Sequence, residues 1–455
     1  MKKIGPMVGN THTETSVTGT SMTIAYREAR EIIRCHVNAH KDDLLITAES
    51  GMTGLINKLQ RILGLRIPQG CQMHKIQITP LAPQDRPVVF ITHMEHHSNH
   101  TSWLETIADV RIVPPGEDGQ VSPEALEKLL LEYQDRPLKI GSFTACSNIS
   151  GIITPYHKLA QVMHRHGGKC IVDFAASGPY VKIDMHPEFM EDGHLDALII
   201  STHKFLGGPG SSGIMAVSKD WYNGSLCPDH PGGGTVDYTN PWGKVIYSAN
   251  PNVREDGGTP AFLQTIRAAM AVRLKEEMGV ENIQRREHEM LNRLLSGLRQ
   301  IPGLHILDDK VPAAKRICIV SFFVQGAHYN LLVRLLNDRF GIQTRGGCSC
   351  AGTYGHFLYD IEEERSLAIS KDISNGDLST KPGWVRVSCS PVMKNSQVDY
   401  IVSAVSQCVA NYSQWSMDYE YNPHSNEYEP VRNDKLVEWK VKSWFRFEGD
   451  GIFSS

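Results

Sequence analysis

The spacing of apolar and polar positions divides the first half of the chain into short strands and amphipathic helices. Apolar residues recur at helical spacing over residues 20–39, and short apolar runs bounded by turn residues predict strands over residues 44–47, 88–92, 139–143, 170–174, 195–201 and 213–217. Helical patterns lie between several of these strands, over residues 55–65, 123–133 and 155–166. This alternation predicts βαβ units and a largely parallel sheet, so we expect an α/β fold.

The pattern changes after a turn-rich stretch over residues 228–260. Two long helices over residues 261–278 and 280–299 are followed by strands over residues 316–324 and 384–390 and by a helix over residues 396–412. We therefore expect a large domain over residues 15–260 and a smaller α+β domain over residues 261–412, to which residues 1–14 could also belong. The charged and aromatic residues 413–455 form a C-terminal extension that we expect to pack on the body or on a partner subunit.

Composition and charge narrow the function classes. The 455 residues include 46 basic and 50 acidic side chains, and a net charge of −4 attracts neither nucleic acid nor an anionic membrane surface. No run reaches the roughly 20 apolar residues of a membrane-spanning helix, and the N-terminus lacks the apolar core of an export signal. Ten dispersed cysteines are typical of free thiols in a reducing compartment, so we expect a cytoplasmic protein.

Two residues at predicted strand ends carry the first candidate chemistry. Lys204 follows the apolar strand over residues 195–201, and Asp173 closes the strand before it. Burial disfavours an ammonium ion, so a lysine at the lip of a buried strand can become nucleophilic, although most lysines are solvated. Asp173 could equally be a helix cap. Together they form the pair that pyridoxal phosphate requires, an amine for its aldehyde carbon and a carboxylate for its pyridine nitrogen.

Two further segments follow predicted strands. Residues 49–54 offer backbone amides at a helix start and the hydroxyls of Ser50 and Thr53, an arrangement that suits a phosphate. Residues 93–100 contain four histidines. Zinc bound by two of them with Cys348 and Cys350 is one alternative, but no standard ligand spacing emerges and we expect no metal centre. The other alternative is an imidazole stacked on a cofactor ring.

Eight motifs, taken in order, point to a family. They are Gly51-Met52-Thr53, Glu95-His96-His97, Ser147-Asn148, Val172-Asp173, Ser201-Thr202-His203-Lys204, residues 254–260, residues 345–351 and Trp384-Val385-Arg386. Over about residues 10–410 the chain resembles the cysteine desulfurase and selenocysteine lyase branch of the class V aminotransferases. The resemblance implies a fold type I pyridoxal-phosphate enzyme with a mostly parallel seven-stranded sheet flanked by helices and a smaller α+β C-terminal domain.

The resemblance also implies roles for the residues that match the cofactor site. Lys204 would hold the cofactor as a Schiff base, Asp173 would face the pyridine nitrogen, and His96 would stack on the ring. The residues that match positions holding the phosphate are Gly51, Met52, Thr53, Ser201 and His203.

A second group of matching residues concerns the partner subunit and the substrate. Thr259 would reach the phosphate of the other subunit's cofactor, which implies a homodimer. The residues that would contact the substrate are Asn148, which would also contact the cofactor, Arg345 and Arg386. A guanidinium suits this role because its planar fork matches a carboxylate. Cys350 falls on the sulfur-accepting position, and Cys348 is an added thiol in the same glycine-rich loop; both could instead be packing residues.

The sequence departs from the family pattern at three places. Ala176 replaces a glutamine that usually contacts the ring oxygen, although Ser177 could substitute for it. Met52 stands where a hydroxyl residue is common. The family's initial segment, with a short aspartate motif near the substrate, has no counterpart before residues 10–12, so we expect either a truncated start or a differently completed site.

These features lead to a specific functional prediction. We expect an enzyme that uses pyridoxal phosphate to remove sulfur or selenium from an L-cysteine-like amino acid, through a persulfide on Cys350 and with release of alanine. A sulfur-acceptor protein would be a partner. One alternative is an aminotransferase, epimerase or other carbon–sulfur lyase in which Cys350 is only structural. A second alternative is a catalytically silent scaffold for sulfur assembly.

Overall fold

The computed structural model describes residues 5, 8–11, 13–71, 73–76, 79–188, 190–431 and 436–445. Part of the predicted N-terminal addition (residues 1–4, 6, 7 and 12) and part of the predicted extension (residues 432–435 and 446–455) lie outside the described residues.

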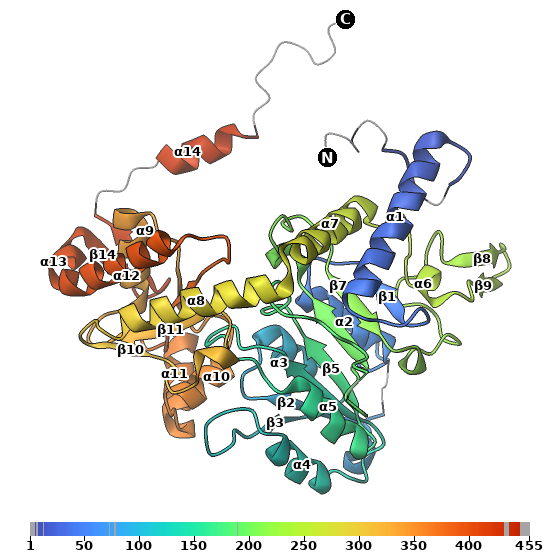
Figure 1. The fold of residues 1–455 in the computed structure, drawn as a ribbon. Helices are drawn as coiled ribbons and strands as arrows, with labels where there is room; N and C mark the ends of the chain where they lie inside the picture. The colour runs from blue at the N-terminus through green and yellow to red at the C-terminus, as the bar shows by residue number, and fades with distance from the viewer. Residues whose placement is uncertain are drawn as a thin grey trace, which may run out of the picture.

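A seven-stranded sheet forms the centre of the larger part of the molecule (Figure 1). Its strands, in spatial order, are β1 (Leu44–Ile46), β7 (Ile214–Val217), β6 (Ala197–Ile200), β5 (Lys169–Asp173), β4 (Lys139–Thr144), β2 (Val88–Thr92) and β3 (Asp109–Val113). Strand β7 runs against the other six strands of this sheet, which are parallel to one another. The prediction of a mostly parallel seven-stranded sheet is confirmed, and the carboxyl ends of β4, β5 and β6 meet at one edge.

Helices cover both faces of this sheet. On one face lie α1 (Val17–His36), α4 (Pro123–Glu132), α5 (Tyr156–Arg165) and α7 (Phe262–Met278). On the other lie α2 (Met52–Ile62) and α3 (His97–Leu104). Strand side chains alternate between the two layers, because Phe90 packs with the first group whereas Val89 and Ile91 pack with the second. Strands buried on both faces read as continuous apolar runs, which is why the sequence predicted most of them.

A second sheet of four antiparallel strands follows in the chain. Its order is β10 (Leu304–Ile306), β11 (Ile319–Val324), β13 (Trp384–Ser388) and β12 (Arg345–Gly347). Its core is shared with α8 (Val280–Leu298), α9 (Tyr329–Phe340) and α12 (Asn395–Ala410). Helix α7 packs along α1, and α8 continues from it through Gly279, at φ +77°, to the second sheet (Figure 1). The domain limits at residues 260 and 412 stay predictions.

Further helices and two hairpins lie outside these two sheets. They are α6 (Pro251–Arg254), the hairpin β8 (Val236–Thr239) and β9 (Val245–Tyr247), α10 (Gly352–Leu358), α11 (Glu363–Ser374), α13 (Tyr412–Trp415), the hairpin β14 (Tyr419–Asn422) and β15 (Glu427–Pro430), and α14 (Leu436–Ser443). Tyr419 and Tyr428 pack against the core of the four-stranded sheet, so this part of the extension lies on the body. No helix in the described ranges combines the length and apolar character that crossing a bilayer requires.

Candidate active site

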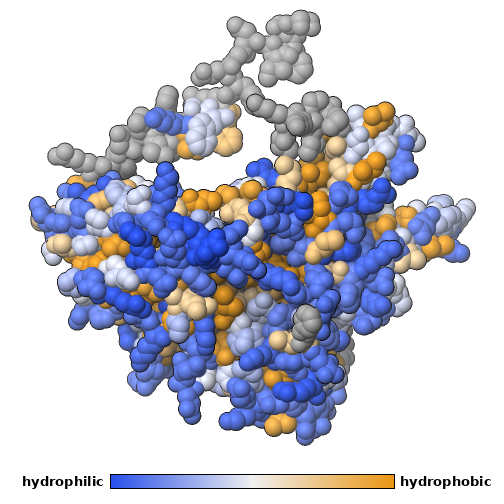
Figure 2. Space-filling model, viewed as in Figure 1, coloured by the Kyte–Doolittle hydropathy of each residue, from blue (hydrophilic) through white to orange (hydrophobic). Residues whose placement is uncertain are grey.

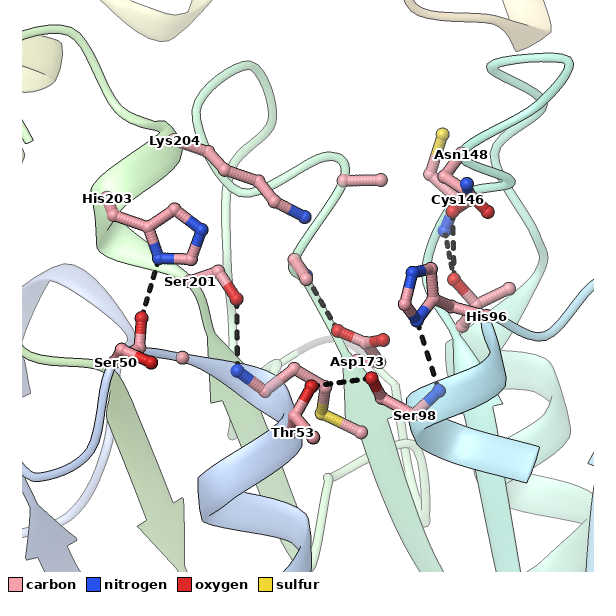
Figure 3. Close-up of a pocket in the computed structure, with 15 residues that line it drawn as sticks. Ser50, Thr53, His96, Ser98, Cys146, Asn148, Asp173, Ser201, His203 and Lys204 are labelled. Carbon is pink, nitrogen blue, oxygen red and sulfur yellow. Dashed lines mark hydrogen bonds between the residues drawn. The ribbon is translucent and has the colours of Figure 1, made fainter. Parts of the chain in front are cut away.

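A cavity of 220 Å³ opens at the carboxyl edge of the seven-stranded sheet (Figure 3). Nine predicted site residues line it: Gly51, Met52, Thr53, His96, Asn148, Asp173, Ser201, His203 and Lys204. The topology explains why Asp173 and Lys204 lie at the same cavity. Asp173 is the last residue of β5, and Lys204 lies in the short 3₁₀ helix η4 (Thr202–Lys204) that follows β6. Ser50, Ser98, Thr144, Cys146, Ala175 and Ala176 complete the lining.

Lys204 extends its amine into this cavity (Figure 3). Part of Lys204 is exposed to solvent, yet the surrounding protein lowers the pKa of Lys204 by desolvation. The charge of Asp173 opposes this shift, and the charges of Arg386 and Arg345 add to it. The amine therefore loses its proton more readily than an ordinary lysine does, as a nucleophilic amine must.

Asp173 is buried at the floor of the cavity, with 3% of its surface exposed. Its Oδ1 accepts a hydrogen bond from the N–H of Ala175 at 2.8 Å. Burial raises the pKa of Asp173, while the Ala175 amide and the charge of Lys204 lower it. The helix-cap alternative is wrong, because the residues described directly after Asp173 form turns and not a helix. The carboxylate is left available for a positively charged group in the cavity.

His96 lies at the start of α3 with its ring in the cavity (Figure 3). Its Nδ1 accepts a hydrogen bond from the N–H of Ser98 at 3.1 Å. Burial lowers the pKa of His96 to about 4, and the charge of Lys204 acts in the same direction. The ring is therefore neutral at physiological pH, and its proton is on Nε2 because Nδ1 is an acceptor.

The start of α2 forms a polar cradle on the opposite wall. Gly51 has φ +154°, and a Cβ at this position would lie 2.7 Å from Oγ of Ser201 and 2.9 Å from Cε1 of His203. The Ser201 hydroxyl accepts from the N–H of Met52 at 3.1 Å, and Nδ1 of His203 donates to the carbonyl of Ser50 at 2.6 Å. Helix α2 has unpaired N–H groups in its first turn and a positive dipole end, so the cradle suits a phosphate.

Asn148 and Arg386 offer unpaired polar atoms beside the cavity. The Oδ1 of Asn148 and the Nε of Arg386 are buried without a partner among the described residues. One other group of each side chain is used structurally, since Nδ2 of Asn148 donates to the carbonyl of Ser349 at 2.8 Å and Nη1 of Arg386 donates to the carbonyl of Asn148 at 3.0 Å. Buried polar atoms without partners are costly, so these two indicate a place for a polar ligand.

Cys350 lies in the segment over residues 348–351, which we call the thiol loop. It connects β12 to α10, and its thiol accepts a hydrogen bond from a guanidinium N–H of Arg345 at 3.2 Å. Arg345 and Arg386 face each other as a cross-strand pair of β12 and β13. Cys348 is half-buried and packs against the core that contains Tyr354 and Trp384, while the alternatives for this thiol stay predictions.

Four predicted residues do not line the cavity. Arg345, Arg386 and Cys350 lie near enough for their charges to act on Lys204. Thr259 is exposed and lies away from the cavity of its own chain. Ser177 is fully buried outside the lining, so it does not take the place of the absent glutamine, whereas Ala176 faces the cavity as the sequence predicted.

The histidines of residues 93–100 do not form the zinc site considered as an alternative. Nε2 of His97 accepts a hydrogen bond from the N–H of Gly352 at 2.9 Å, and Nδ1 of His100 lies 3.0 Å from the Thr353 hydroxyl. Among the described residues, groups of three possible ligands are His40, Asp43 and His186, and His164, His194 and Asp196. Neither group contains a histidine of residues 93–100 or a cysteine of the thiol loop.

Glu95 has a role that sequence reasoning missed. It is 1% exposed and accepts hydrogen bonds from the Thr92 hydroxyl at 2.7 Å, the Thr144 amide at 2.8 Å and the Asn99 side chain at 2.8 Å. Burial raises the pKa of Glu95 to about 7, although these hydrogen bonds lower it. Glu95 thus joins the ends of β2 and β4 to α3 and supports His96 beside it. An acidic residue between an apolar strand and a helix start was the available signal.

Comparisons with known proteins agree with this geometry. The profile of the family described as aminotransferase class-V matches residues 2–401. A probable cysteine desulfurase from Halalkalibacterium halodurans is 28% identical over 351 residues, 75% of this chain and 77% of that protein. A cysteine desulfurase from Synechococcus elongatus is 30% identical over 348 residues, 75% of this chain and 50% of that protein.

Solved structures share the fold. The apo structure of a cysteine desulfurase from Thermococcus onnurineus has a TM-score of 0.68 and 21% identity, covering 89% of this chain and 88% of that chain. The cysteine desulfurase CsdA of Escherichia coli, in an S-sulfonic acid form, has a TM-score of 0.66 and 20% identity, covering 88% of both chains.

Proposed function

The chain belongs to the aminotransferase class-V family, and from this premise we propose that it removes sulfur, or selenium, from an L-cysteine-like amino acid with pyridoxal phosphate as cofactor. The observation that carries the proposal is the Cys350 thiol, held by Arg345 at 3.2 Å beside a cavity that contains a lysine with a lowered pKa and a buried aspartate. The names of the relatives support the same activity.

The residues of the cavity fit pyridoxal phosphate. The cradle at Gly51, which a Cβ would fill, offers N–H groups and hydroxyls to a phosphate. Asp173 would pair with the pyridine nitrogen, His96 would lie against the ring, and Lys204 would hold the aldehyde carbon. When bound, the cofactor supplies an electron sink for negative charge at the substrate's α-carbon.

The substrate and the cofactor would use the two polar atoms left unpaired. The Nε of Arg386 and the Oδ1 of Asn148 are buried without partners among the described residues. The guanidinium would take the substrate's carboxylate, while the Oδ1 of Asn148 would accept a hydrogen bond from a donor group of the substrate or the cofactor.

Lys204 and Cys350 would perform the proton and sulfur steps. Lys204 Nζ, once free, would take the α-proton, for which a lowered pKa suits it. The Cys350 thiolate would attack the substrate sulfur, so that an S–S bond forms as the substrate's C–S bond breaks. The electron pair of the broken bond stays with the substrate carbon, which takes a proton. Cysteine would leave as alanine, and the enzyme would hold a persulfide.

The test is alanine release from L-cysteine by the holoenzyme, compared in two matched variants. Cys350→Ser removes the thiol beside Arg345 and should abolish sulfur transfer. Cys348→Ser changes a thiol two positions away in the same loop and should retain most of the rate. Absence of alanine with the holoenzyme contradicts the proposal, and turnover of amino acids that survives Cys350→Ser would indicate an aminotransferase or a related lyase instead.

We extend the proposal to a homodimer. Thr259 is exposed away from its own cavity, as a residue that serves another subunit would be. An apolar groove of 700 Å³ between α1 and α7, lined in part by Ile32, Ile266 and Leu274, begins beside Leu206, two residues after Lys204. Figure 2 shows apolar residues exposed around these helices. Such a patch on a surface that is otherwise polar supports a subunit contact here.

We also propose a sulfur-acceptor protein as partner and a cytoplasmic location. The persulfide must be passed on before the next turnover, which requires an acceptor thiol. All ten cysteines are free, as expected in a reducing compartment.

A further inference from the structure

The thiol loop has an unusual backbone. Ser349 and Cys350 are consecutive residues with φ of +49° and +61°. Residues other than glycine rarely adopt this left-handed region of the backbone. Such a conformation persists only where the surroundings hold it. The neighbours of the loop therefore decide where the Cys350 thiol points.

His97 holds the backbone on both sides of the Cys350–Gly352 segment. Its own N–H donates to the carbonyl of Cys350 at 2.7 Å, and its ring Nε2 accepts from the N–H of Gly352 at 2.9 Å. Because Nε2 is an acceptor, the neutral ring has its proton on Nδ1. Burial lowers the pKa of His97, and the charge of Lys381 acts in the same direction, so the ring keeps this acceptor at neutral pH.

His97 is also next to the cavity in the chain. It is the first residue of α3, directly after His96, whose ring lines the cavity. The same helix end therefore fixes both the imidazole against the cofactor position and the backbone that carries the thiol. The other contacts of the loop come from different elements, namely Asn148 on Ser349 and Arg345 on Cys350.

We propose that His97 is a positioning residue, which sets the distance and direction of the Cys350 thiol relative to the cavity by fixing the Cys350–Gly352 backbone to the start of α3. The proposal rests on the proposed function, in which Cys350 accepts sulfur. It adds a residue to the site that touches neither the cofactor position nor the reacting atoms. An imidazole suits this role because its far nitrogen reaches the Gly352 amide.

The experiment compares the holoenzyme with His97→Ala, His97→Gln and His100→Ala. Glutamine keeps an acceptor oxygen at about the reach of Nε2, and His100 is a histidine on the same helix that contacts a side chain, Thr353, rather than the loop backbone. The absorbance of the lysine-bound cofactor checks that each variant is folded with an intact cavity. The readouts are hydrogen exchange of the peptide containing Gly352 and the single-turnover rate of persulfide formation from L-cysteine.

We expect His97→Ala to exchange faster at this peptide and to form persulfide about tenfold or more slowly, because misplacing a reacting group by a fraction of an ångström has effects of this size. His97→Gln should restore both readouts, and His100→Ala should change neither. Unchanged exchange in His97→Ala, or faster exchange with an unchanged persulfide rate, overturns the proposal. Failure of the wild-type holoenzyme to form any persulfide would instead overturn the proposed function.

Discussion

Two buried aspartates, one at the carboxyl end and one at the amino end of neighbouring strands in the seven-stranded sheet, have different hydrogen-bond and charge partners. Asp173 ends β5 at the cavity, and Asp196 precedes β6 at the other edge, with exposures of 3% and 0%. Asp173 accepts a hydrogen bond from one backbone amide, and burial raises its pKa. Burial also raises the pKa of Asp196, but His164 at 2.8 Å, Lys169 at 2.8 Å and the Cys170 amide at 2.8 Å outweigh it and leave the pKa lowered.

We infer that this difference separates the carboxylate proposed to act on the cofactor from a structural one. Asp196 has His164, Lys169 and a backbone amide as partners, so removing its charge would leave buried groups uncompensated. Asp173 lacks such partners, so its charge is costly until a cation enters the cavity. Both residues are buried, but they lie at opposite ends of neighbouring strands and differ in their partners.

The largest expected effect is that of Asp173→Asn on catalysis. The substitution keeps the shape and the acceptor for the Ala175 amide but removes the charge that would pair with the pyridine nitrogen. We expect the rate with L-cysteine to fall about 100- to 1,000-fold, the size found when one preorganised electrostatic partner is lost. The melting temperature of the cofactor-free protein should stay equal or rise, because the raised pKa of Asp173 means that its charge destabilises the folded state at neutral pH. A normal rate in this variant would contradict the catalytic role of the Asp173 carboxylate.

The second effect is that of Asp196→Asn on stability. Loss of the charge leaves His164 and Lys169 without their shared partner, and we expect the free energy of unfolding to fall by about 3 kcal/mol. The measurement is a melting curve at pH 6, with Asp192→Asn as control, because the Asp192 side chain is exposed and only its backbone carbonyl contacts His164. Cofactor affinity should be unchanged, and a loss of cofactor without loss of stability would contradict the assignment.

The smallest effect concerns the pH dependence of stability. Asp196 has a lowered pKa, so its contribution is present above its unfolded pKa of about 3.9 and is lost as pH falls through the lower folded value. Burial lowers the pKa of His164, but Asp196 and the Asp192 carbonyl outweigh it and raise the pKa, so its contribution is present below about 6.5 and is lost as pH rises through the folded value. Wild-type minus Asp196→Asn stability should therefore be greatest between about pH 4 and 6.5; a difference that is independent of pH would argue against the ion pair.

The cavity could be predicted from the sequence because parallel strands bring their ends together. Lys204 and Asp173 follow apolar runs that are recognisable in the sequence, so their common edge follows from the fold. The edge strand β3 and the helix α3 were missed because β3 is only partly buried and α3 is short and polar. The role of Glu95 could not be predicted from its motif, because its four hydrogen bonds come from residues on several elements.

The surroundings of the two aspartates and of the thiol loop could not be predicted in this way. The contact of His97 with Gly352 joins residues 255 positions apart, and His164 and Asp196 come from separate segments. Such contacts depend on side-chain packing between elements that show no periodic signal. The Cys350 thiol could be named from its motif, but its backbone conformation and its contact with His97 required the structure.

The most direct test of the account is mass spectrometry of the peptide that contains Cys350 after the holoenzyme has reacted with L-cysteine. The account predicts a gain of one sulfur atom on Cys350, reversed by a thiol reductant and absent from Lys204→Ala. Alanine formation with no added sulfur on Cys350, or with the added sulfur on Cys348, would contradict it.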